Sequence, residues 1–158
     1  MKLIGVIGHK NCGKTTLTER LVAELVGRGL TVSTLKRSHH AVRMDTPGTD
    51  SFRHAEAGAR QVILATDSKL ALYEALPAPE PLEALVARLA PCDIVIAEGW
   101  KRGTHPRIEA WRRDCGKPPL ALTDPAILAV ARDTPVEVSQ PQFDLDDIAG
   151  IADFICST

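Results

Sequence analysis

The chain has 158 residues, of which 44% are hydrophobic, 25% charged and 4% aromatic. This composition is typical of one globular domain, residues 1–158, because it is too apolar for a disordered chain and too charged for a membrane protein. The formal charge of −1 lacks the basic excess of proteins that bind phosphate backbones, so it argues against nucleic acid as the main partner. The sequence contains no apolar run of the roughly 18 residues that a spanning helix needs, and its glycine-broken start does not resemble a signal peptide. We therefore expect a cytoplasmic protein without membrane contact.

Short apolar segments alternate along the chain with longer segments of helical periodicity. Leu17, Leu21 and Leu25 lie on one stripe, which predicts a helix directly after the first apolar segment. The predicted strands are residues 2–7, 31–35, 61–66, 70–73, 93–97, 107–111 and 127–131, and the predicted helices are residues 15–28, 50–58, 82–89 and 146–156. Because several strands are apolar throughout, the pattern predicts an α/β fold with a mostly parallel sheet flanked by helices. The pattern does not define the order of the strands.

The strongest motif is GHKNCGKT at residues 8–15, which fits the P-loop pattern G-x-x-x-x-G-K-[ST] between an apolar strand and an amphipathic helix. Its glycines let backbone N–H groups turn around a phosphate, and the start of the helix adds unpaired N–H groups and a positive dipole end. We expect Lys14 to reach the β- and γ-phosphates and the Thr15 hydroxyl to ligate Mg²⁺. The alternative is an ordinary strand–loop–helix turn. A G-x-G-x-x-G motif is absent, which argues against an NAD enzyme.

A carboxylate follows the apolar run of residues 94–97. Glu98 precedes a glycine and is expected at the carboxyl edge of the sheet, where open α/β folds bind ligands. We interpret Glu98 as a residue that holds Mg²⁺ or its waters, with a solvated strand end as the alternative. Asp93, at the start of the same strand, is expected at the opposite edge as a turn residue.

A basic, histidine-containing segment follows the second predicted strand. Lys36 and Arg37 are candidates for binding an anion, and Asp50 is a candidate for approaching Mg²⁺ or the attacking water. The alternative for Asp50 is a helix N-cap, a role for which Thr49 is also suited. His39 and His40 are adjacent and point to opposite sides of an extended chain, so they form a poor two-ligand metal site and equally fit a surface role.

The cysteines and the remaining basic residues give weaker signals. The four cysteines Cys12, Cys92, Cys115 and Cys156 are expected to be free thiols, because none forms a CxxC pair and a chain of this size needs no disulfide framework. We expect the loop that contains Cys12 to bind through its backbone. A basic cluster, formed by Lys101, Arg102, Arg107, Arg112 and Arg113, fits either an anionic ligand or a solvated face.

Four segments occur together in a recognisable order. GHKNCGKTTL, LKRSHHAVRMDTPGTDSFRHAEAGA, DIVIAEGWK and HPRIEAWR resemble the MobB family of molybdopterin-guanine dinucleotide biosynthesis adapter proteins over roughly residues 2–113. The resemblance implies a three-layer P-loop NTPase fold that binds GTP and Mg²⁺, with weak GTPase activity at most. It also implies a homodimer and a partner, a MobA-type guanylyltransferase that attaches GMP to molybdopterin. The molybdopterin cofactor itself is a further candidate ligand.

The resemblance also assigns residues to the site. The positions expected to contact the nucleotide through the first motif are Gly8, Asn11, Cys12, Gly13, Lys14, Thr15 and Thr16. The family's second signature is matched by Lys36, His39, His40, Asp50 and Ser51, although this chain has Arg37 where the family often has histidine. Glu98 matches the acidic strand end. Glu98 and Asp50 are the expected catalytic residues, and Thr15, Glu98 and Asp50 are the expected metal ligands.

Two other functions fit parts of the sequence. A small-molecule kinase would use the same P-loop but needs an arginine-bearing lid, and the arginines of residues 107–113 lie in a segment with strand character. A metallochaperone GTPase would need a closer set of Cys and His ligands. Support for guanine from the residues is weak: an NKxD box is absent, and Asp124 and Asp133 are candidates for the base that also fit plain loop roles.

Overall fold

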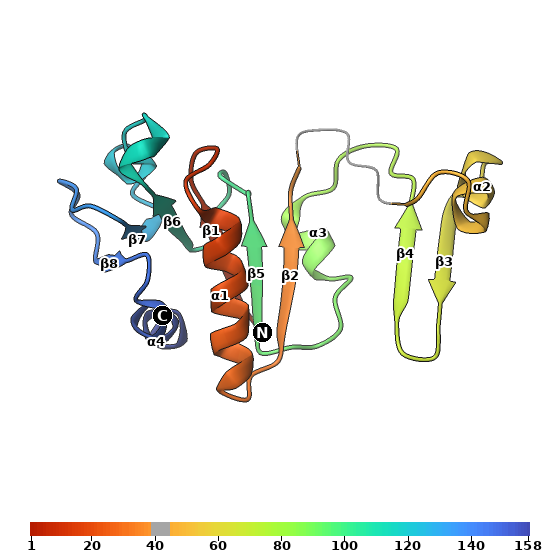
Figure 1. Cartoon of the computed structure of the whole chain (residues 1–158), viewed down its shortest axis with the longest axis horizontal. Helices are drawn as coiled ribbons and strands as arrows, with labels where there is room; N and C mark the ends of the chain where they lie inside the picture. Colours follow the sequence, from red (N-terminus) through yellow and green to blue (C-terminus); the bar gives the residue numbers. More distant parts are fainter. Residues whose placement is uncertain (39–44) are drawn as a thin grey trace. The chain divides into compact units, whose positions relative to one another are not determined.

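Figure 1 shows the computed structural model of the chain, which describes residues 1–38 and 45–158. The chain divides into two compact units, one formed by residues 1–37 and 82–158 and the other by residues 38–81. The expected single domain stays a prediction. Among the described residues, no helix is both long enough and apolar enough to cross a membrane.

The first unit is built on a six-stranded sheet with the order β2-β5-β1-β6-β7-β8, in which every neighbouring pair is parallel. Its strands are β1 (Lys2–Ile7), β2 (Val32–Lys36), β5 (Ile94–Glu98), β6 (Arg107–Trp111), β7 (Ile127–Arg132) and β8 (Gln142–Asp144). Its helices are α1 (Lys14–Gly27), α3 (Leu82–Val86) and α4 (Ile148–Ser157), with two short 3₁₀ helices, η1 (Arg113–Cys115) and η2 (Leu120–Leu122). The expected α/β fold with a mostly parallel sheet is therefore confirmed.

Both faces of this sheet are covered. On one face, α1 and α4 pack side by side, and their apolar stripes, including Leu21 and Ile151, meet strand residues such as Ile96 in one buried cluster. On the other face, Leu82 of α3 packs with Trp100, and a separate cluster next to η2 includes Trp111. β5 is buried along its whole length, which explains why its sequence is uniformly apolar up to Glu98. The result is the three-layer arrangement that the sequence predicted.

The strand register determines which residues share the carboxyl edge of the sheet. Glu98 is the register partner of Lys36 on one side and of Val6 on the other. The P-loop begins two residues after Val6, so the basic end of β2, the acidic end of β5 and the loop after β1 meet at one edge. Asp93 lies at the opposite end of β5, where it accepts hydrogen bonds from the backbone N–H and hydroxyl of Thr31, as its expected turn role requires.

The second unit holds an antiparallel hairpin, β3 (Gln61–Ala65) and β4 (Leu70–Glu74), and the short helix α2 (Asp50–Glu56). Thr49, not Asp50, is the N-cap of α2: its side chain accepts a hydrogen bond from the backbone N–H of Phe52. The N-cap alternative for Asp50 is therefore wrong.

Candidate functional site

The P-loop has a backbone that its glycines make possible. Gly8 and Gly13 have φ values of 146° and 89°, and Asn11 also lies in the left-handed region at 65°. A Cβ on Gly8 would stand 2.3 Å from the carbonyl oxygen of Ala110 in β6, so only glycine fits this close approach between neighbouring strands. The loop then enters α1 at Lys14.

A hollow of about 380 Å³ opens beside this loop. It is lined by Lys10, Asn11, Gly13, Lys14, Thr15, Thr16, Glu98 and Arg112. Most of this lining comes from the motif and the acidic strand end that the sequence singled out. Lys10 and Arg112 add two positive charges. Arg112 belongs to the basic cluster that was considered for an anionic ligand, whereas Lys10 was not singled out.

Thr15, Glu98 and Lys36 form a polar contact at the edge of the hollow. The hydroxyl of Thr15 donates a hydrogen bond to Oε1 of Glu98 at 2.9 Å, and Nζ of Lys36 donates to Thr15 Oγ1 at 3.3 Å. Nζ of Lys36 also lies 3.4 Å from Oε1 of Glu98, forming an ion pair with this nearly buried carboxylate. The structure thus brings together three residues that lie far apart in the sequence.

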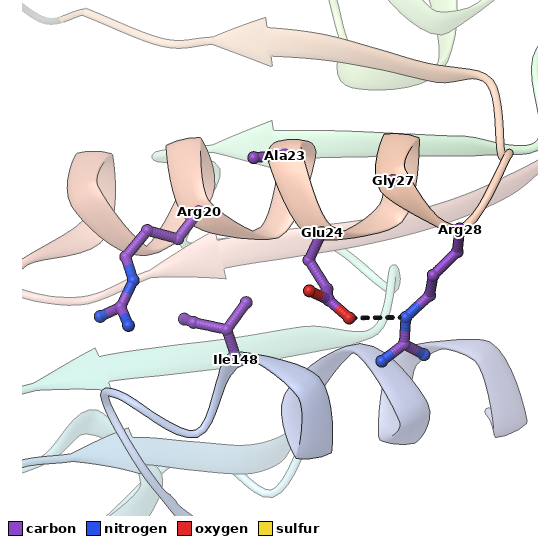
Figure 2. Close-up of a pocket in the computed structure, with 6 residues that line it drawn as sticks. All are labelled: Arg20, Ala23, Glu24, Gly27, Arg28 and Ile148. Carbon is purple, nitrogen blue, oxygen red and sulfur yellow. Dashed lines mark hydrogen bonds and ion pairs between the residues drawn. The ribbon is translucent and has the colours of Figure 1, made fainter.

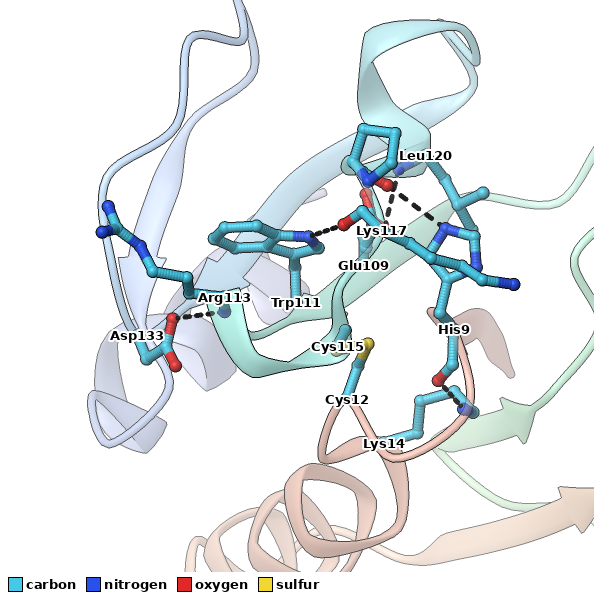
Figure 3. The surroundings of a disulfide bond; sticks show 11 residues. His9, Cys12, Lys14, Glu109, Trp111, Arg113, Cys115, Lys117, Leu120 and Asp133 are labelled. Atoms are coloured by element: carbon cyan, nitrogen blue, oxygen red, sulfur yellow. Dashed lines mark hydrogen bonds between the residues drawn. A yellow bond between two sulfur atoms is a disulfide. The ribbon is translucent and has the colours of Figure 1, made fainter.

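Lys14 folds back over the loop from which it emerges. Its ammonium donates a hydrogen bond of 2.6 Å to the carbonyl oxygen of His9, at the start of the loop (Figure 3). Burial lowers the pKa of Lys14, and the positive charge of Lys101 acts in the same direction while Glu98 opposes it. The lysine therefore sits where an added anion would be most favourable, among cations and beside the loop amides.

The oxygen pair of Thr15 and Glu98 fits a magnesium ion. Mg²⁺ takes oxygen ligands at about 2.1 Å in octahedral geometry, which separates adjacent ligands by about 3 Å. The 2.9 Å between Thr15 Oγ1 and Glu98 Oε1 matches this spacing. Within the described part of the chain, no group of three or more His, Cys, Asp and Glu side chains is arranged so that it could hold a metal ion.

The other expected residues belong to the second unit or lie outside the described residues. Asp50 lies in the second unit, with its side chain exposed and 3.9 Å from Arg53. Ser51 is buried next to it in α2. His39 and His40 lie outside the described residues. The expected roles of these four residues stay predictions.

The prediction of free thiols is wrong for two of the four cysteines. Cys12, in the P-loop, is disulfide-bonded to Cys115 in η1, with the two Cα atoms 5.5 Å apart, while Cys92 and Cys156 are free. Spacing along the chain does not reveal this pair, because its members lie 103 positions apart. The Cys12 side chain is fully buried, faces η1 and does not line the hollow, so a contact with a ligand would come from its backbone.

The segment after β6 is hydrogen-bonded both to the P-loop and to Glu109 of β6. Glu109, fully buried, accepts hydrogen bonds from the backbone N–H groups of Leu120 and Ala121 at 2.8 and 2.9 Å. Burial raises the pKa of Glu109, and these two bonds oppose the shift. Nε2 of His9 donates to the carbonyl oxygen of Pro118 at 3.2 Å, which connects the P-loop to the same segment (Figure 3).

The candidate guanine-binding aspartates are engaged within the protein. Asp124 pairs with the buried Arg107 at 3.3 Å and accepts the backbone N–H of Ala126. Asp133 accepts the backbone N–H of Arg113. Both contacts match the loop roles that were the alternative for these residues.

A second hollow, of about 500 Å³, lies along α1 near the start of α4 (Figure 2). It is larger, but its charged side chains already have partners: Arg28 binds Glu24 at 2.8 Å and Asp153 at 2.6 Å, and Arg20 binds Asp146. The pairs with Asp146 and Asp153 join α1 to the region of α4. The hollow at the P-loop is therefore the candidate site.

The chain is similar to known proteins over nearly its whole length. The family model of MobB, described as molybdopterin guanine dinucleotide synthesis protein B, matches residues 3–133. A molybdopterin-guanine dinucleotide biosynthesis adapter protein of Haemophilus influenzae is 41% identical over 155 residues, which cover 97% of this chain and 86% of that protein. The corresponding protein of Escherichia coli is 33% identical over 158 residues, covering 97% and 90%.

Solved structures agree with the sequence comparison. The crystal structure of a MobB homolog from Bacillus stearothermophilus matches with a TM-score of 0.73 and 26% identity, covering 100% of both chains. A crystal structure of molybdopterin-guanine biosynthesis protein B matches with a TM-score of 0.73 and 29% identity over 98% of each chain. With the P-loop and the acidic strand end in place, these matches show that the chain belongs to the MobB family.

Proposed function

We propose that this chain, a MobB-family adapter protein of molybdopterin-guanine dinucleotide biosynthesis, works by binding Mg-GTP and by serving a MobA-type molybdenum cofactor guanylyltransferase in the cytoplasm. The observation that carries the proposal is the hollow of the P-loop, where loop, Lys14 and the Thr15–Glu98 pair line one space. A loop of this kind is built to surround a phosphate chain with N–H groups.

In this proposal, different residues of the hollow bind the phosphates and the magnesium ion. Lys14 leaves the carbonyl of His9 and binds the β- and γ-phosphates, while Lys10 and Arg112 add positive charge around them. Thr15 and Glu98 hold the magnesium ion, which neutralises phosphate charge when bound. Lys36 sits next to Glu98 and orients its carboxylate.

The structure favours an adapter over a small-molecule kinase. A kinase needs a mobile arginine that closes over the transferred phosphoryl group. In the segment considered for that role, Arg107 is 3% exposed and paired with Asp124. Arg112 does reach the hollow, but it lies directly between β6 and η1 and not on a separate lid. We therefore expect slow GTP hydrolysis at most and no transfer of phosphate to a second substrate.

Guanine, MobA and the homodimer enter the proposal through the family. The hairpin of the second unit supports the homodimer, because register pairs Ile63 with Leu72 and Ala65 with Leu70 on one apolar face. Ile63, Leu70 and Leu72 are 60%, 68% and 45% exposed. Exposed apolar clusters of this kind mark interaction surfaces, and we assign this face to a second copy of the chain.

Calorimetry with purified protein tests the nucleotide. We expect heat with GTP in the presence of Mg²⁺ and weaker heat with ATP; no heat with either nucleotide at millimolar concentration rejects the proposal.

Incubation with γ-labelled GTP and pterin acceptors tests the kinase alternative, which a labelled pterin would establish. A pull-down from cell extract tests the partner, and it should recover the enzyme that makes the guanine dinucleotide.

A further inference from the structure

The disulfide lies directly behind the nucleotide hollow. Asn11 and Gly13, on either side of Cys12, line the hollow, whereas the Cys12 side chain is 0% exposed and points to η1. Its partner Cys115 is partly exposed at the end of η1. The covalent bond therefore fixes the middle of the P-loop without filling the space where a ligand would bind.

The segment that carries Cys115 is itself well anchored. Nε1 of Trp111 donates to the carbonyl oxygen of Lys117 at 2.8 Å, and the backbone N–H of Arg113 donates to Asp133 at 3.1 Å. Between these anchors, Arg112 approaches the loop so closely that a Cβ on Gly13 would stand 3.0 Å from its Nε. The disulfide thus ties the P-loop to a segment that its own hydrogen bonds anchor.

We propose that the Cys12–Cys115 pair is a redox-modification site that exchanges with a low-molecular-weight thiol of the glutathione class and sets the affinity of the P-loop for its nucleotide. This inference rests on the proposed function. The disulfide form holds the loop ready for a phosphate chain, and the dithiol form releases it.

The exchange has a defined order because Cys115 is partly exposed, whereas Cys12 is fully buried. A thiolate attacks Sγ of the partly exposed Cys115, the Cys12–Cys115 bond breaks, and Cys12 leaves as a thiolate that takes a proton from water. A second thiol then attacks the mixed disulfide and frees Cys115. Two small-molecule thiols are oxidised to one disulfide while the protein disulfide is reduced to two thiols, and the oxidised small molecule reverses the reaction.

The effect on the nucleotide follows from preorganisation. In the dithiol form, the loop loses conformational freedom when it surrounds a phosphate, and this loss costs binding free energy. In the disulfide form, the cross-link has already removed that freedom, so binding does not carry this cost. We expect the nucleotide Kd to be about three- to tenfold higher in the dithiol form, the size expected when binding must order about one additional side chain. By reciprocity, saturating nucleotide must shift the disulfide–dithiol equilibrium toward the disulfide by the same factor.

Two measurements on the full chain test the proposal. Calorimetry with Mg-GTP compares the protein equilibrated with oxidised glutathione and the protein treated with a dithiol reductant, after peptide mass mapping has verified the Cys12–Cys115 linkage. Quantitative thiol labelling in a glutathione redox buffer, with and without GTP, then gives the equilibrium shift. A Cys12→Ser/Cys115→Ser variant should bind like the reduced protein and ignore reductant, whereas a Cys92→Ser/Cys156→Ser variant should respond like the natural chain.

The outcomes separate this inference from the proposed function. A linkage that does not form under oxidised glutathione overturns the redox site. Equal Kd values in both forms, or tighter binding by the dithiol form, overturn the coupling while leaving nucleotide binding intact. If neither form binds the nucleotide although the linkage has been mapped, the proposed function itself fails. The proposed coupling then fails with it.

Discussion

At the scale of single residues, the site depends on charged side chains that different elements bring to the hollow at the P-loop. Lys14 comes from the start of α1, Lys36 and Glu98 from the ends of two adjacent strands, and Arg112 from the loop after β6. Together with Lys10, these are four positive side chains against one carboxylate, which favours an anionic ligand. The carboxylate of Glu98 accepts a hydrogen bond from the Thr15 hydroxyl, and a bound metal would contact both oxygens.

We expect Lys14→Ala to weaken nucleotide binding without unfolding the chain. The lysine contributes a charge-assisted hydrogen bond worth about 1.5–3 kcal/mol, so the Kd should rise about ten- to hundredfold. Calorimetry measures the affinity and circular dichroism the fold. Lys69→Ala, in the exposed turn of the hairpin, is the control and should bind normally. An unfolded Lys14→Ala protein would make this lysine structural.

Glu98→Gln should separate binding from hydrolysis. Glutamine keeps the shape and accepts the hydrogen bond from Thr15, but it loses the charge that holds Mg²⁺ or its waters. We expect GTP turnover to fall about tenfold, a loss of about 1.4 kcal/mol in transition-state stabilisation, with affinity largely kept. Phosphate release assays measure turnover, with Glu19→Gln on the exposed surface of α1 as control. Unchanged turnover would remove Glu98 from the mechanism.

Glu109 predicts a pH dependence of stability. Because burial raises its pKa in the folded state above the ordinary 4.5, the folded chain binds this proton more tightly than the unfolded chain. Its contribution to stability is therefore present below pH 4.5 and is lost as pH rises through the folded value, at about 1.4 kcal/mol for each pH unit of that window. Urea unfolding of the natural chain and of Glu109→Gln from pH 4 to 8 measures it.

The comparison isolates Glu109 from the other carboxylates. We expect the unfolding free energy of the natural chain, minus that of Glu109→Gln, to fall as pH rises above 4.5. A difference that stays constant or grows over this range would show that the hydrogen bonds from Leu120 and Ala121 outweigh burial.

At the scale of elements, the packing of α1 against α4 and the sheet determines how firmly the P-loop is held. Leu21, fully buried, lies in the cluster with Ile151 and Ile155 of α4. Leu21→Ala should lower the free energy of unfolding by about 2–5 kcal/mol, through lost burial and the cavity left behind. Val26→Ala on the exposed face of the same helix is the control, with an effect within about 0.5 kcal/mol. Equal losses in both variants in urea unfolding would contradict this packing.

Elements with a strong local pattern are predicted well from the sequence. β1 and β6 have the predicted bounds, α1 begins and ends one residue earlier than predicted, and β2 is shifted by one residue. β8 is missed because Gln142–Asp144 has only three residues and no apolar run; it exists because the edge of β7 offers a hydrogen-bonding partner. Helix α3 ends three residues before the predicted end.

At the scale of the whole molecule, long-range pairing explains what the sequence could not predict. The motif and Glu98 are visible locally, but the place of β6 beside β1 follows from the strand order, which no local pattern defines. That neighbourhood brings Arg112 to the hollow and Cys115 to Cys12. In the sequence, Arg112 is visible only as a basic residue directly after an apolar strand. That pattern fits an anion-binding residue and a solvated face equally well.

The last prediction concerns the assembly. If the apolar face of the hairpin binds a second copy, charges placed there should separate the dimer. Ile63→Asp combined with Leu70→Asp puts two charges on exposed positions of this face that are not register partners of one another, so the change should disturb association far more than the fold. We expect light scattering with size exclusion to give the dimer mass for the natural chain and the monomer mass for the variant, with nucleotide binding retained. Leu122→Asp, an equally accessible apolar residue in η2, is the control and should remain dimeric. A natural chain that is monomeric at all concentrations, or a double variant that stays dimeric, would assign this face to another partner.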